Sequence, residues 1–262
     1  MNRIETVFVK EKKVFIPFVT AGDPSLEMTE ALILALAQEG VKLIEIGLPF
    51  SDPIAEGPVI QAADNRALSK GCTIDAIFVM LKRVRECTDI PIVFLTYINP
   101  IFVYGRDKFF AKAQEVGVDG VIVPDVPFEE RNIIAQEAAK YDITLISLIA
   151  PTSETRIQMI AQEAKGYIYL VSSLGVTGMR QNITTDIAAI VKKIRDVTAT
   201  PVTVGFGIAT PEQAEAMARL SDGAIVGSAI VKIIGTYGDS CLEPVIKYVK
   251  AMLAAVAKAA KC

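Results

Sequence analysis

The chain has 262 residues, of which 52% are hydrophobic and 22% are charged, and its formal net charge is −3. Acids and bases are interspersed, so no basic surface favours nucleic acid or an anionic membrane as a partner. The chain contains no histidine, which excludes Ser-His and Cys-His catalytic pairs and His-ligated metal sites, so acid–base chemistry falls to Asp, Glu, Lys, Tyr or Cys.

The N-terminal segment, Met1 to Lys13, lacks the apolar core of a signal peptide. No apolar run approaches the ~20 residues that a membrane-spanning helix needs. The four cysteines show no paired spacing, so we expect free thiols in a reducing cytosol. They are Cys72, Cys87, Cys241 and Cys262.

Strand-like apolar runs alternate with helical patterns from one end of the chain to the other. The expected strands are 15–20, 43–47, 91–96, 119–123, 143–149, 167–172, 201–205 and 223–227. About eight βα units without a linker predict a single (β/α)8 TIM barrel over residues 1–262. An open doubly wound sheet is the alternative, but it usually has fewer strands and a nucleotide fingerprint after the first one. We also expect an extra N-terminal helix at 2–12, which caps the barrel bottom, and a short phosphate-binding helix after strand eight.

Several helix starts are marked by capping residues. Thr210, Pro211 and Gln213 form a capping-box pattern with proline at the first helical position. Thr185-Asp186 precedes the helical pattern 187–197, and Thr73 with Asp75 precedes 77–85.

Glu45 is an acid within the apolar strand 43–47, and a stiff Pro/Gly loop with further acids follows it. Alternation places Leu43, Glu45 and Gly47 on one face of a strand that is buried on both faces in a helix-covered parallel sheet. A carboxylate there costs free energy unless it is paired or functional. The residues alone leave two interpretations open, a structural ion pair and acid–base chemistry. Glu56, in the loop, is either a solvated acid, a helix cap or a second functional carboxylate.

The active site of a barrel lies at the C-terminal ends of its strands. These ends are mostly apolar and aromatic, which suits a flat hydrophobic substrate. They include Phe18–Thr20, Glu45, Leu95–Tyr97, Pro124–Asp125, Tyr169–Ser172 and Phe206. Asp125 could be catalytic, a hydrogen-bond acceptor within its loop, or a cap for the helix that begins near Phe128, and the cap is the favoured interpretation.

Glycines at two neighbouring strand ends indicate a phosphate site. Gly205-Phe206-Gly207 follows strand seven, and Gly223 through Gly227-Ser228 spans strand eight and opens a helical run. Glycines let backbone N–H groups approach an anion, and a helix N-terminus supplies free donors. The alternative is close helix–sheet packing. The third glycine-rich loop, Gly175-Val176-Thr177-Gly178, is either a mobile lid or an ordinary long loop.

Six motifs, in order over essentially the whole chain, resemble the tryptophan synthase alpha subunit. They are 18–24 (FVTAGDP), 45–53 (EIGLPFSDP), 57–61 (GPVIQ), 175–178 (GVTG), 205–208 (GFGI) and 227–231 (GSAIV). The second is highly specific. The resemblance implies a cofactor-free (β/α)8 barrel that performs the reversible retro-aldol cleavage of indole-3-glycerol phosphate to indole and glyceraldehyde 3-phosphate.

The resemblance assigns Glu45 as the general acid/base and places the carboxylate that holds the indole N–H at Glu56. This sequence departs from the family at Glu56, where Asp is usual. A Glu keeps the charge but adds one methylene, and misplacement by about 1 Å can cost roughly 10²-fold in rate. We expect that Glu56 keeps the role in a slightly re-posed loop.

Further site residues follow from the same resemblance. The substrate pocket positions are Phe18, Leu95, Tyr97, Leu148, Tyr169, Thr177 and Phe206. The phosphate cradle is Gly178, Gly207, Gly227 and Ser228. The face that docks a PLP-dependent beta subunit, in an α2β2 tetramer, is Asp52, Pro53, Asn99 and Pro127. No metal site is expected, and PLP is expected on the partner alone.

Two competing interpretations remain at the level of the sequence. Another phosphate-binding barrel of amino-acid biosynthesis would carry the same glycines, but the Glu45–Gln61 motif and the scarcity of lysines at strand ends argue against it. In the second interpretation, the chain is non-catalytic or weakly active and mainly activates a beta subunit. The Glu at position 56, where the family usually has Asp, leaves this open.

Overall fold

The computed structural model describes residues 2–152, 154–172, 186–205 and 207–261. Its strands are all parallel and follow the order β5-β4-β3-β2-β1-β9-β8-β7-β6. Their bounds are β1 Val14–Thr20, β2 Ile44–Gly47, β3 Ile92–Leu95, β4 Gly120–Ile122, β5 Thr144–Leu145, β6 Ser147–Ile149, β7 Ile168–Val171, β8 Val202–Gly205 and β9 Gly223–Val226.

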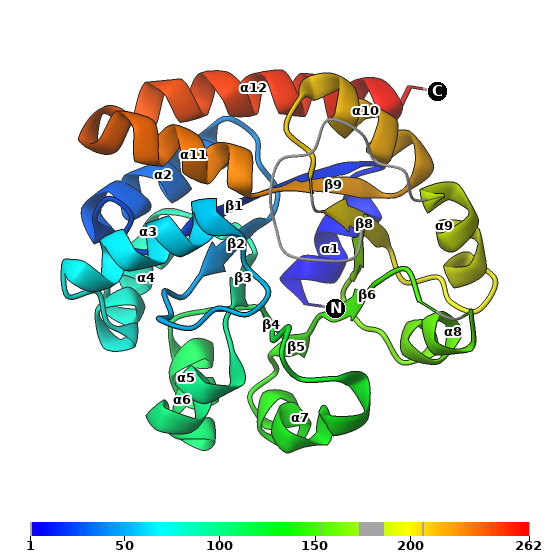
Figure 1. Cartoon of the computed structure of the whole chain (residues 1–262), viewed down its shortest axis with the longest axis horizontal. Helices are drawn as coiled ribbons and strands as arrows, with labels where there is room; N and C mark the ends of the chain where they lie inside the picture. The colour runs from blue at the N-terminus through cyan, green and yellow to red at the C-terminus, as the bar shows by residue number, and fades with distance from the viewer. Residues whose placement is uncertain (1, 153, 173–185, 206, 262) are drawn as a thin grey trace.

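Segments β5 and β6 are one strand interrupted at Ile146. The first segment pairs with β4 and the second with β7, so the nine segments occupy eight positions around a barrel that closes through this strand. Figure 1 shows the strands at the centre with helices around them. The predicted (β/α)8 barrel and its eight strands are confirmed.

The helices alternate with the strands along the chain. Their bounds are α1 Arg3–Lys10, α2 Leu26–Gln38, α3 Pro58–Ser69, α4 Ile74–Cys87, α5 Ile98–Tyr104, α6 Arg106–Glu115, α7 Asn132–Lys140, α8 Glu154–Gln162, α9 Ile187–Arg195, α10 Pro211–Leu220, α11 Ser228–Tyr237 and α12 Leu242–Ala259, with 3-10 turns η1 Phe128–Glu130 and η2 Gly238–Ser240. The expected helix after the last strand is α11, which precedes the outer helix α12 (Figure 1).

Capping side chains begin the helices where the sequence predicts. Thr73, Asp186 and Thr210 each accept a hydrogen bond from the backbone N–H three residues on, at the starts of α4, α9 and α10. At α10 the capping box with Gln213 is complete. Each cap satisfies a donor that the helix itself cannot use.

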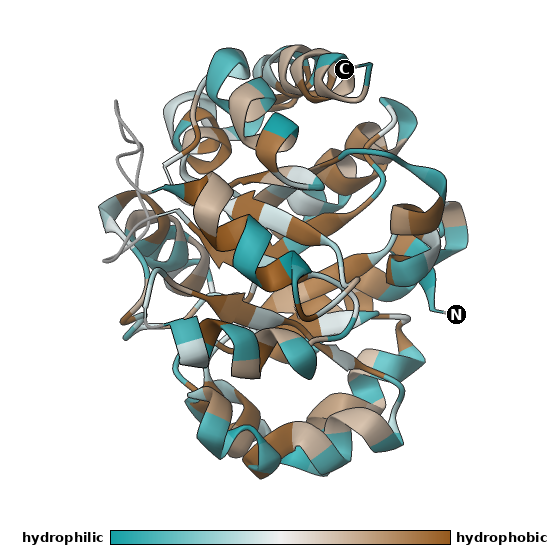
Figure 2. Cartoon of the chain, turned by 90° about the vertical axis from the view of Figure 1, so that its right-hand side faces the viewer, coloured by the Kyte–Doolittle hydropathy of each residue, from teal (hydrophilic) through white to brown (hydrophobic). Residues whose placement is uncertain are grey.

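The core has two layers. One lies between strands and helices, and the other fills the barrel interior and includes Ile4 and Val7 of α1. Arg3 ties α1 to Asp119, at the start of β4, with a 2.6 Å hydrogen bond from Nε to Oδ1. The N-terminal helix thus closes the bottom of the barrel, as predicted. Figure 2 shows the hydrophobic residues concentrated on the strands and on the inward faces of the helices.

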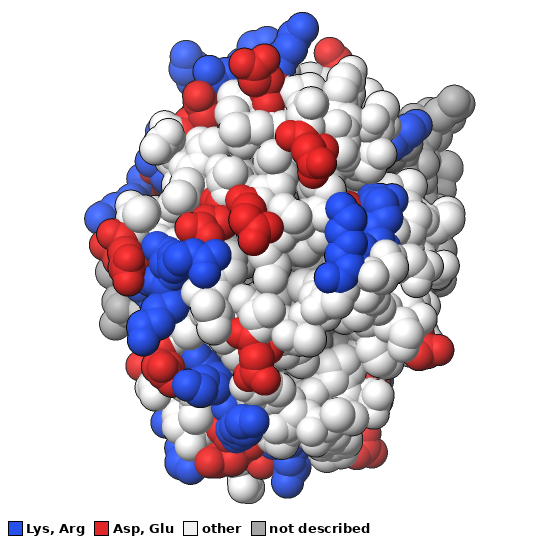
Figure 3. All heavy atoms as spheres, turned by 90° about the vertical axis from the view of Figure 1, so that its left-hand side faces the viewer, with Lys and Arg blue, Asp and Glu red and all other residues white. Residues whose placement is uncertain are grey.

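The outer surface carries mixed charges. On the face in Figure 3, basic and acidic side chains lie among one another without a large area of one sign. Within the described ranges no helix is long and apolar enough to cross a membrane. Cys72, Cys87 and Cys241 are free thiols, while Cys262 lies outside the described residues.

Candidate active site

Glu45 lies on the inner face of β2, between Phe18 of β1 and Val93 of β3 in the strand register. Its side chain is 1% exposed. The Tyr167 hydroxyl donates a 2.6 Å hydrogen bond to its Oε1. Burial raises the pKa of Glu45 to about 8, and the hydrogen bond from Tyr167 opposes that rise. At neutral pH the group therefore holds a proton that it can donate, and it can take one back.

Unsatisfied polar atoms mark the same end of the barrel. Among the described residues, three buried side-chain oxygens have no hydrogen-bond partner, namely Thr20 Oγ1, Glu45 Oε2 and Thr96 Oγ1. They lie on or directly after three adjacent strands, β1, β2 and β3. Because buried polar atoms are nearly always satisfied, such a group in a native protein needs an explanation. A polar substrate in the barrel mouth supplies one.

Glu56 is also buried, with 5% of its surface exposed, although it lies in the loop between β2 and α3. Burial raises its pKa to about 7, opposed by a hydrogen bond with Tyr97. The Ala55 N–H donates to the Tyr97 hydroxyl at 3.2 Å, which leaves that hydroxyl proton free to serve Glu56. Gln61 Nε2 donates to the Glu56 carbonyl at 2.7 Å and holds the loop against α3.

Tyr169 lies within electrostatic range of both carboxylates. It is buried on β7, and both Glu45 and Glu56 raise its pKa well above the ordinary value, after burial as the main cause. Both acids therefore act on one phenol in the barrel mouth, and the sequence positions 45 and 56 converge in the fold.

Strand-end glycines make room for aromatic rings. A Cβ on Gly47 would lie 2.5 Å from the Phe18 ring, and one on Gly205 would lie 2.3 Å from the Tyr169 hydroxyl. A Cβ on Gly227 would lie 3.2 Å from Phe18. These glycines thus shape the pocket wall as well as any anion site.

The ends of β8 and β9 have the features of a phosphate cradle. Gly207 has φ +84°, a conformation that favours glycine. Gly227 is the N-cap of α11, and no side chain caps the first N–H groups of this helix. Gly227 and Ser228 are both half-buried. The first N–H groups of this ten-residue helix are therefore available to an anion.

The comparisons with known proteins agree with this geometry. A family model described as tryptophan synthase alpha chain matches residues 4–260. A tryptophan synthase alpha chain of Thermoanaerobacter sp. (strain X514) is 46% identical over 96% of this chain and 98% of its own length. That of Lactiplantibacillus plantarum is 51% identical over 90% of each chain. This chain belongs to the tryptophan synthase alpha chain family.

Solved structures of the family have the same barrel. The alpha chain of Legionella pneumophila subsp. pneumophila superposes with a TM-score of 0.89, at 36% identity over 98% of both chains. A chain from the Pyrococcus furiosus tryptophan synthase a2b2 complex superposes with a TM-score of 0.85, at 36% identity over 93% of this chain and 99% of that one. As a member of the family, this chain is a carbon–carbon lyase that cleaves indole-3-glycerol phosphate in tryptophan biosynthesis.

The fold brings most of the predicted pocket residues to one mouth. Phe18 and Tyr97 are buried there, and Leu95 packs against both the barrel interior and the cluster around Phe18. Leu148, on β6, is half-buried. Thr177, Gly178 and Phe206 lie outside the described residues, so their predicted roles stay predictions.

The predicted partner face has three exposed members, Asp52, Asn99 and Pro127. Pro53 is buried within the chain, so it can only support the loop that carries Asp52.

Asp125 does not cap the helix near Phe128. Its two carboxylate oxygens accept from the Ile98 N–H at 3.1 and 3.2 Å, which caps α5 from a neighbouring loop. The prediction was wrong because it considered only the helix that follows Asp125 in the sequence. The N–H group that Asp125 caps lies 27 residues earlier in the chain.

Two residues at the site were missed from the sequence. Tyr167, the partner of Glu45, precedes β7, and its inward direction follows from its alternation with Tyr169 and Val171. Asp64 is a buried acid on α3. An acid on the inward face of an amphipathic helix was the available signal.

A hollow of about 980 Å³ runs alongside β5, β6 and α7. It is lined by Leu148 and Asp125 at its upper end and by Asn2, Glu5 and Lys165 at its lower end. Neither Glu45 nor Glu56 is among the residues that line this hollow.

Proposed function

We propose that Glu45 is the acid/base group of the indole-3-glycerol phosphate cleavage and that Glu56 holds the indole N–H. The observation that carries this proposal is the unpartnered Oε2 of Glu45, buried in the barrel mouth beside a single phenol donor. Its raised pKa, about 8, suits a group that starts the reaction protonated.

Proton transfer balances around Glu45. The acid donates its proton to the indole ring carbon that bears the side chain, and the ring nitrogen takes up positive charge. The resulting carboxylate removes the proton of the side-chain hydroxyl. The carbon–carbon bond then breaks, its electron pair returns to the ring, and indole and an aldehyde are released. Glu45 ends protonated as it began, so the step needs no cofactor; the PLP of the complete enzyme is expected on the beta subunit.

Glu56 supports the charge that develops on the ring nitrogen. An ionised carboxylate within hydrogen-bonding reach of the N–H stabilises the cation more than the neutral substrate, which lowers the barrier. Its burial strengthens the interaction because little water screens it. The Tyr97 hydroxyl favours the ionised form and fixes the carboxylate on the indole side of the pocket.

The phosphate cradle at the ends of β8 and β9 binds the substrate phosphate and so positions the indole beside the two acids. Gly207, which follows β8, and Gly227 and Ser228, at the N-terminus of α11, supply backbone donors to the phosphate. Gly178 is assigned the same role. Phe18, Leu95, Tyr97, Leu148 and Tyr169 enclose the indole, joined by Thr177 and Phe206. Positioning of this kind supplies a large part of the rate beyond acid–base catalysis.

We also propose that a beta subunit docks over Asp52, Asn99 and Pro127. The exposed apolar residues Ile54, Phe102 and Val103 lie within a few residues of Asp52 and Asn99, which supports a protein partner there. The Pyrococcus furiosus structure is described as an a2b2 complex. Light scattering of a mixture with a beta chain tests this assembly.

The site assignment is tested with substitutions at both acids. Release of indole from indole-3-glycerol phosphate is measured for the wild type, Glu45→Gln, Glu56→Gln and Glu56→Asp. We expect Glu45→Gln to lose roughly 10²–10⁴-fold in kcat, the usual size of general acid–base catalysis. Glu56→Gln should lose activity too, and Glu56→Asp should keep more of it.

The matched control is Glu86→Gln, an exposed glutamate on α4. It should cleave the substrate at the wild-type rate and unfold at the wild-type temperature. Full turnover by folded Glu45→Gln would overturn the acid/base assignment, and full turnover by Glu56→Gln would overturn the role of Glu56.

A further inference from the structure

Two neighbouring helices begin at the two ends of the proposed substrate. Helix α3 starts directly after Glu56 and its N-cap Gly57, and α11 starts at Gly227 and Ser228 of the phosphate cradle. The substrate therefore spans from one helix start to the other. Because a different element holds each end, the separation of α3 and α11 sets the separation of the two anchors.

Helices α3 and α11 pack against each other and against β1. Figure 1 shows them side by side on the left of the molecule. In one buried cluster, Phe18 of β1 packs with side chains of both helices, namely Ile60, Ala63 and Val231. A Cβ on Gly227 would lie 3.2 Å from the Phe18 ring, so this cluster reaches the phosphate cradle itself.

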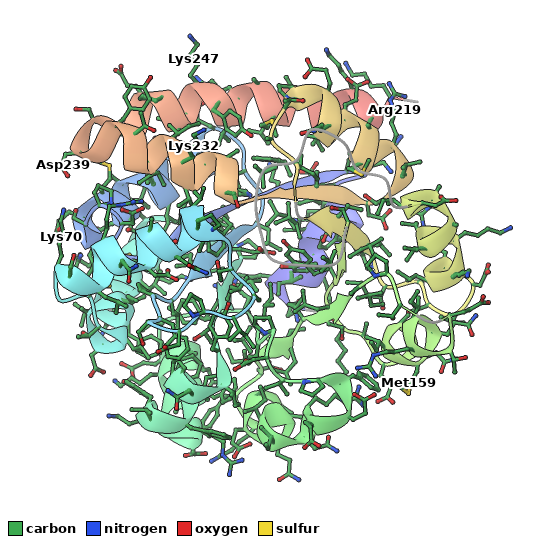
Figure 4. The ribbon with its side chains drawn as sticks, viewed as in Figure 1. Lys70, Met159, Arg219, Lys232, Asp239 and Lys247 are labelled. Carbon is green, nitrogen blue, oxygen red and sulfur yellow. The ribbon has the colours of Figure 1, made fainter. Side chains whose placement is uncertain are left out.

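Farther along α3, Arg66 ties the helix to the loop between β1 and α2. It donates two hydrogen bonds to the Asp23 carboxylate of that loop, from Nε at 2.8 Å and from Nη2 at 2.7 Å. Asp23 is 1% exposed. A forked pair of this kind fixes direction as well as distance. Lys70, at the rim of the molecule (Figure 4), adds a 2.8 Å hydrogen bond to the Pro24 carbonyl of the same loop.

The Arg66 guanidinium also lies against α11. A Cβ on Gly235 would lie 2.9 Å from Nη2 of Arg66 and 3.2 Å from its Cζ. This close approach leaves no room for a side chain at position 235 while Arg66 stays bonded to Asp23. Arg66 of α3 therefore contacts both α11 and the loop after β1, and its two bonds to a buried carboxylate hold it there.

The two helix starts carry the anchors themselves. Gln61 of α3 donates from Nε2 to the Glu56 carbonyl at 2.7 Å, so a movement of α3 moves the backbone that bears Glu56. A movement of α11 moves the first N–H groups of that helix, which belong to the phosphate cradle. The relative position of the two helices is thus the relative position of the two anchors.

We propose that Arg66 is a positioning residue of the lyase, which fixes the span between Glu56 and the phosphate cradle by holding α3 and α11 to the Asp23 loop. The proposal rests on the proposed roles of Glu56 and of the cradle. Two linked anchors bind a substrate most tightly when their spacing matches it, because the second anchor then engages without further ordering. A loosened span should therefore weaken binding of the whole substrate and leave the affinity for each half unchanged.

The experiment compares the whole substrate with its two halves. Calorimetry measures the Kd of indole-3-glycerol phosphate, indole and glycerol 3-phosphate in the Glu45→Gln background, which suppresses turnover. Arg66→Lys keeps a positive charge beside Asp23 but loses the planar fork. We expect it to weaken the whole substrate about tenfold and to change the Kd of each half by less than about twofold.

Gly235→Ala disturbs the same contact from α11 and leaves both charged groups in place. Alanine is the better helix former, so the helix itself is not weakened, while the added methyl displaces the guanidinium from Asp23. The same pattern of Kd values is expected. The matched control is Arg83→Lys, because Arg83 of α4 makes a similar pair of hydrogen bonds to Glu30 of α2. It should leave all three Kd values unchanged.

Wild-type affinity for the whole substrate in either folded variant, Arg66→Lys or Gly235→Ala, would overturn the proposal. An equal loss for the whole substrate and for glycerol 3-phosphate would overturn it too, because Arg66 would then maintain the cradle and not the span. Failure of the proposed function looks different. In that case, adding Glu56→Gln to the Glu45→Gln chain would leave its Kd for indole unchanged.

Discussion

At the scale of single residues, Tyr167 is the side chain that acts most directly on the pKa and the orientation of Glu45. Its hydroxyl donates to Oε1 of the acid, and it is the only partner of that carboxylate within the described part of the chain. The bond favours the ionised form and so opposes the effect of burial on the pKa. It leaves Oε2 for the substrate. The orientation of the Glu45 carboxylate and its pKa thus both depend on the Tyr167 hydroxyl.

Tyr167→Phe should therefore raise the pKa of Glu45 further. The base form becomes harder to reach, so the kcat profile should move to higher pH by about one unit. The free energy of unfolding at pH 9, where Glu45 ionises, should fall by about 1–3 kcal/mol from the lost bond to a charged group. The pH profile of indole release and urea unfolding measure the two effects.

Tyr237→Phe, at an exposed tyrosine of α11, is the matched control and should change neither quantity. If Tyr167→Phe keeps the wild-type pH profile, the bond to Glu45 has no part in setting its acidity.

At the scale of elements, the outer helices are stabilised by local sequence signals separate from the chemistry. Helix α10 begins with the Thr210–Gln213 capping box and packs on α12, far along the chain from both acids. Such caps act on helix ends alone. The lengths and starts of these helices are therefore consequences of nearby residues.

Thr210→Ala should cost about 1 kcal/mol, as removal of an N-cap commonly does, and lower Tm by about 2–4 °C for a domain of this size. Its kcat for indole release should stay at the wild-type value. Differential scanning calorimetry measures the first effect. Thr236→Ala serves as the control, because that hydroxyl donates to the Lys232 carbonyl within α11 and caps nothing. A smaller loss in Thr210→Ala than in Thr236→Ala would contradict the capping argument.

At the scale of the whole molecule, the barrel concentrates three buried acids whose pKa values burial raises. Glu45 and Asp64 rise to about 8 and Glu56 to about 7. Their unfolded values lie near 4. Between about pH 4 and 8 the unfolded chain therefore releases protons that the folded chain keeps, and the free energy of unfolding falls as pH rises.

We expect Tm of the ligand-free chain to decrease from pH 5 to pH 8.5, most steeply between about pH 5 and 7, where the acids are ionised in the unfolded chain and still protonated in the folded one. Glu45→Gln should reduce that slope because it removes one of the three retained protons. Calorimetry at constant ionic strength across this range is the measurement. A Tm that rises with pH up to 8.5 in the wild type would show that these acids ionise at ordinary values in the fold.

The eight strands, the caps at Thr73, Asp186 and Thr210 and the inward face of Glu45 could be predicted from the sequence, because each follows from local propensity and side-chain alternation. The two acids could be named from the motif at 45–58. The hydrogen-bond partner of Glu45 was not predicted. Tyr167 lies 122 residues from Glu45, and Asp125 caps a helix that precedes it.

The sequence by itself therefore determined the barrel, the order of its elements and an acid at the end of its second strand. The tertiary structure alone decided how that acid and its neighbours are protonated. Burial of Glu45, Glu56 and Asp64, and the single phenols that reach the first two, arise only when distant strands close into a barrel. A pKa depends on desolvation and on nearby charges, and neither is defined until the chain has folded.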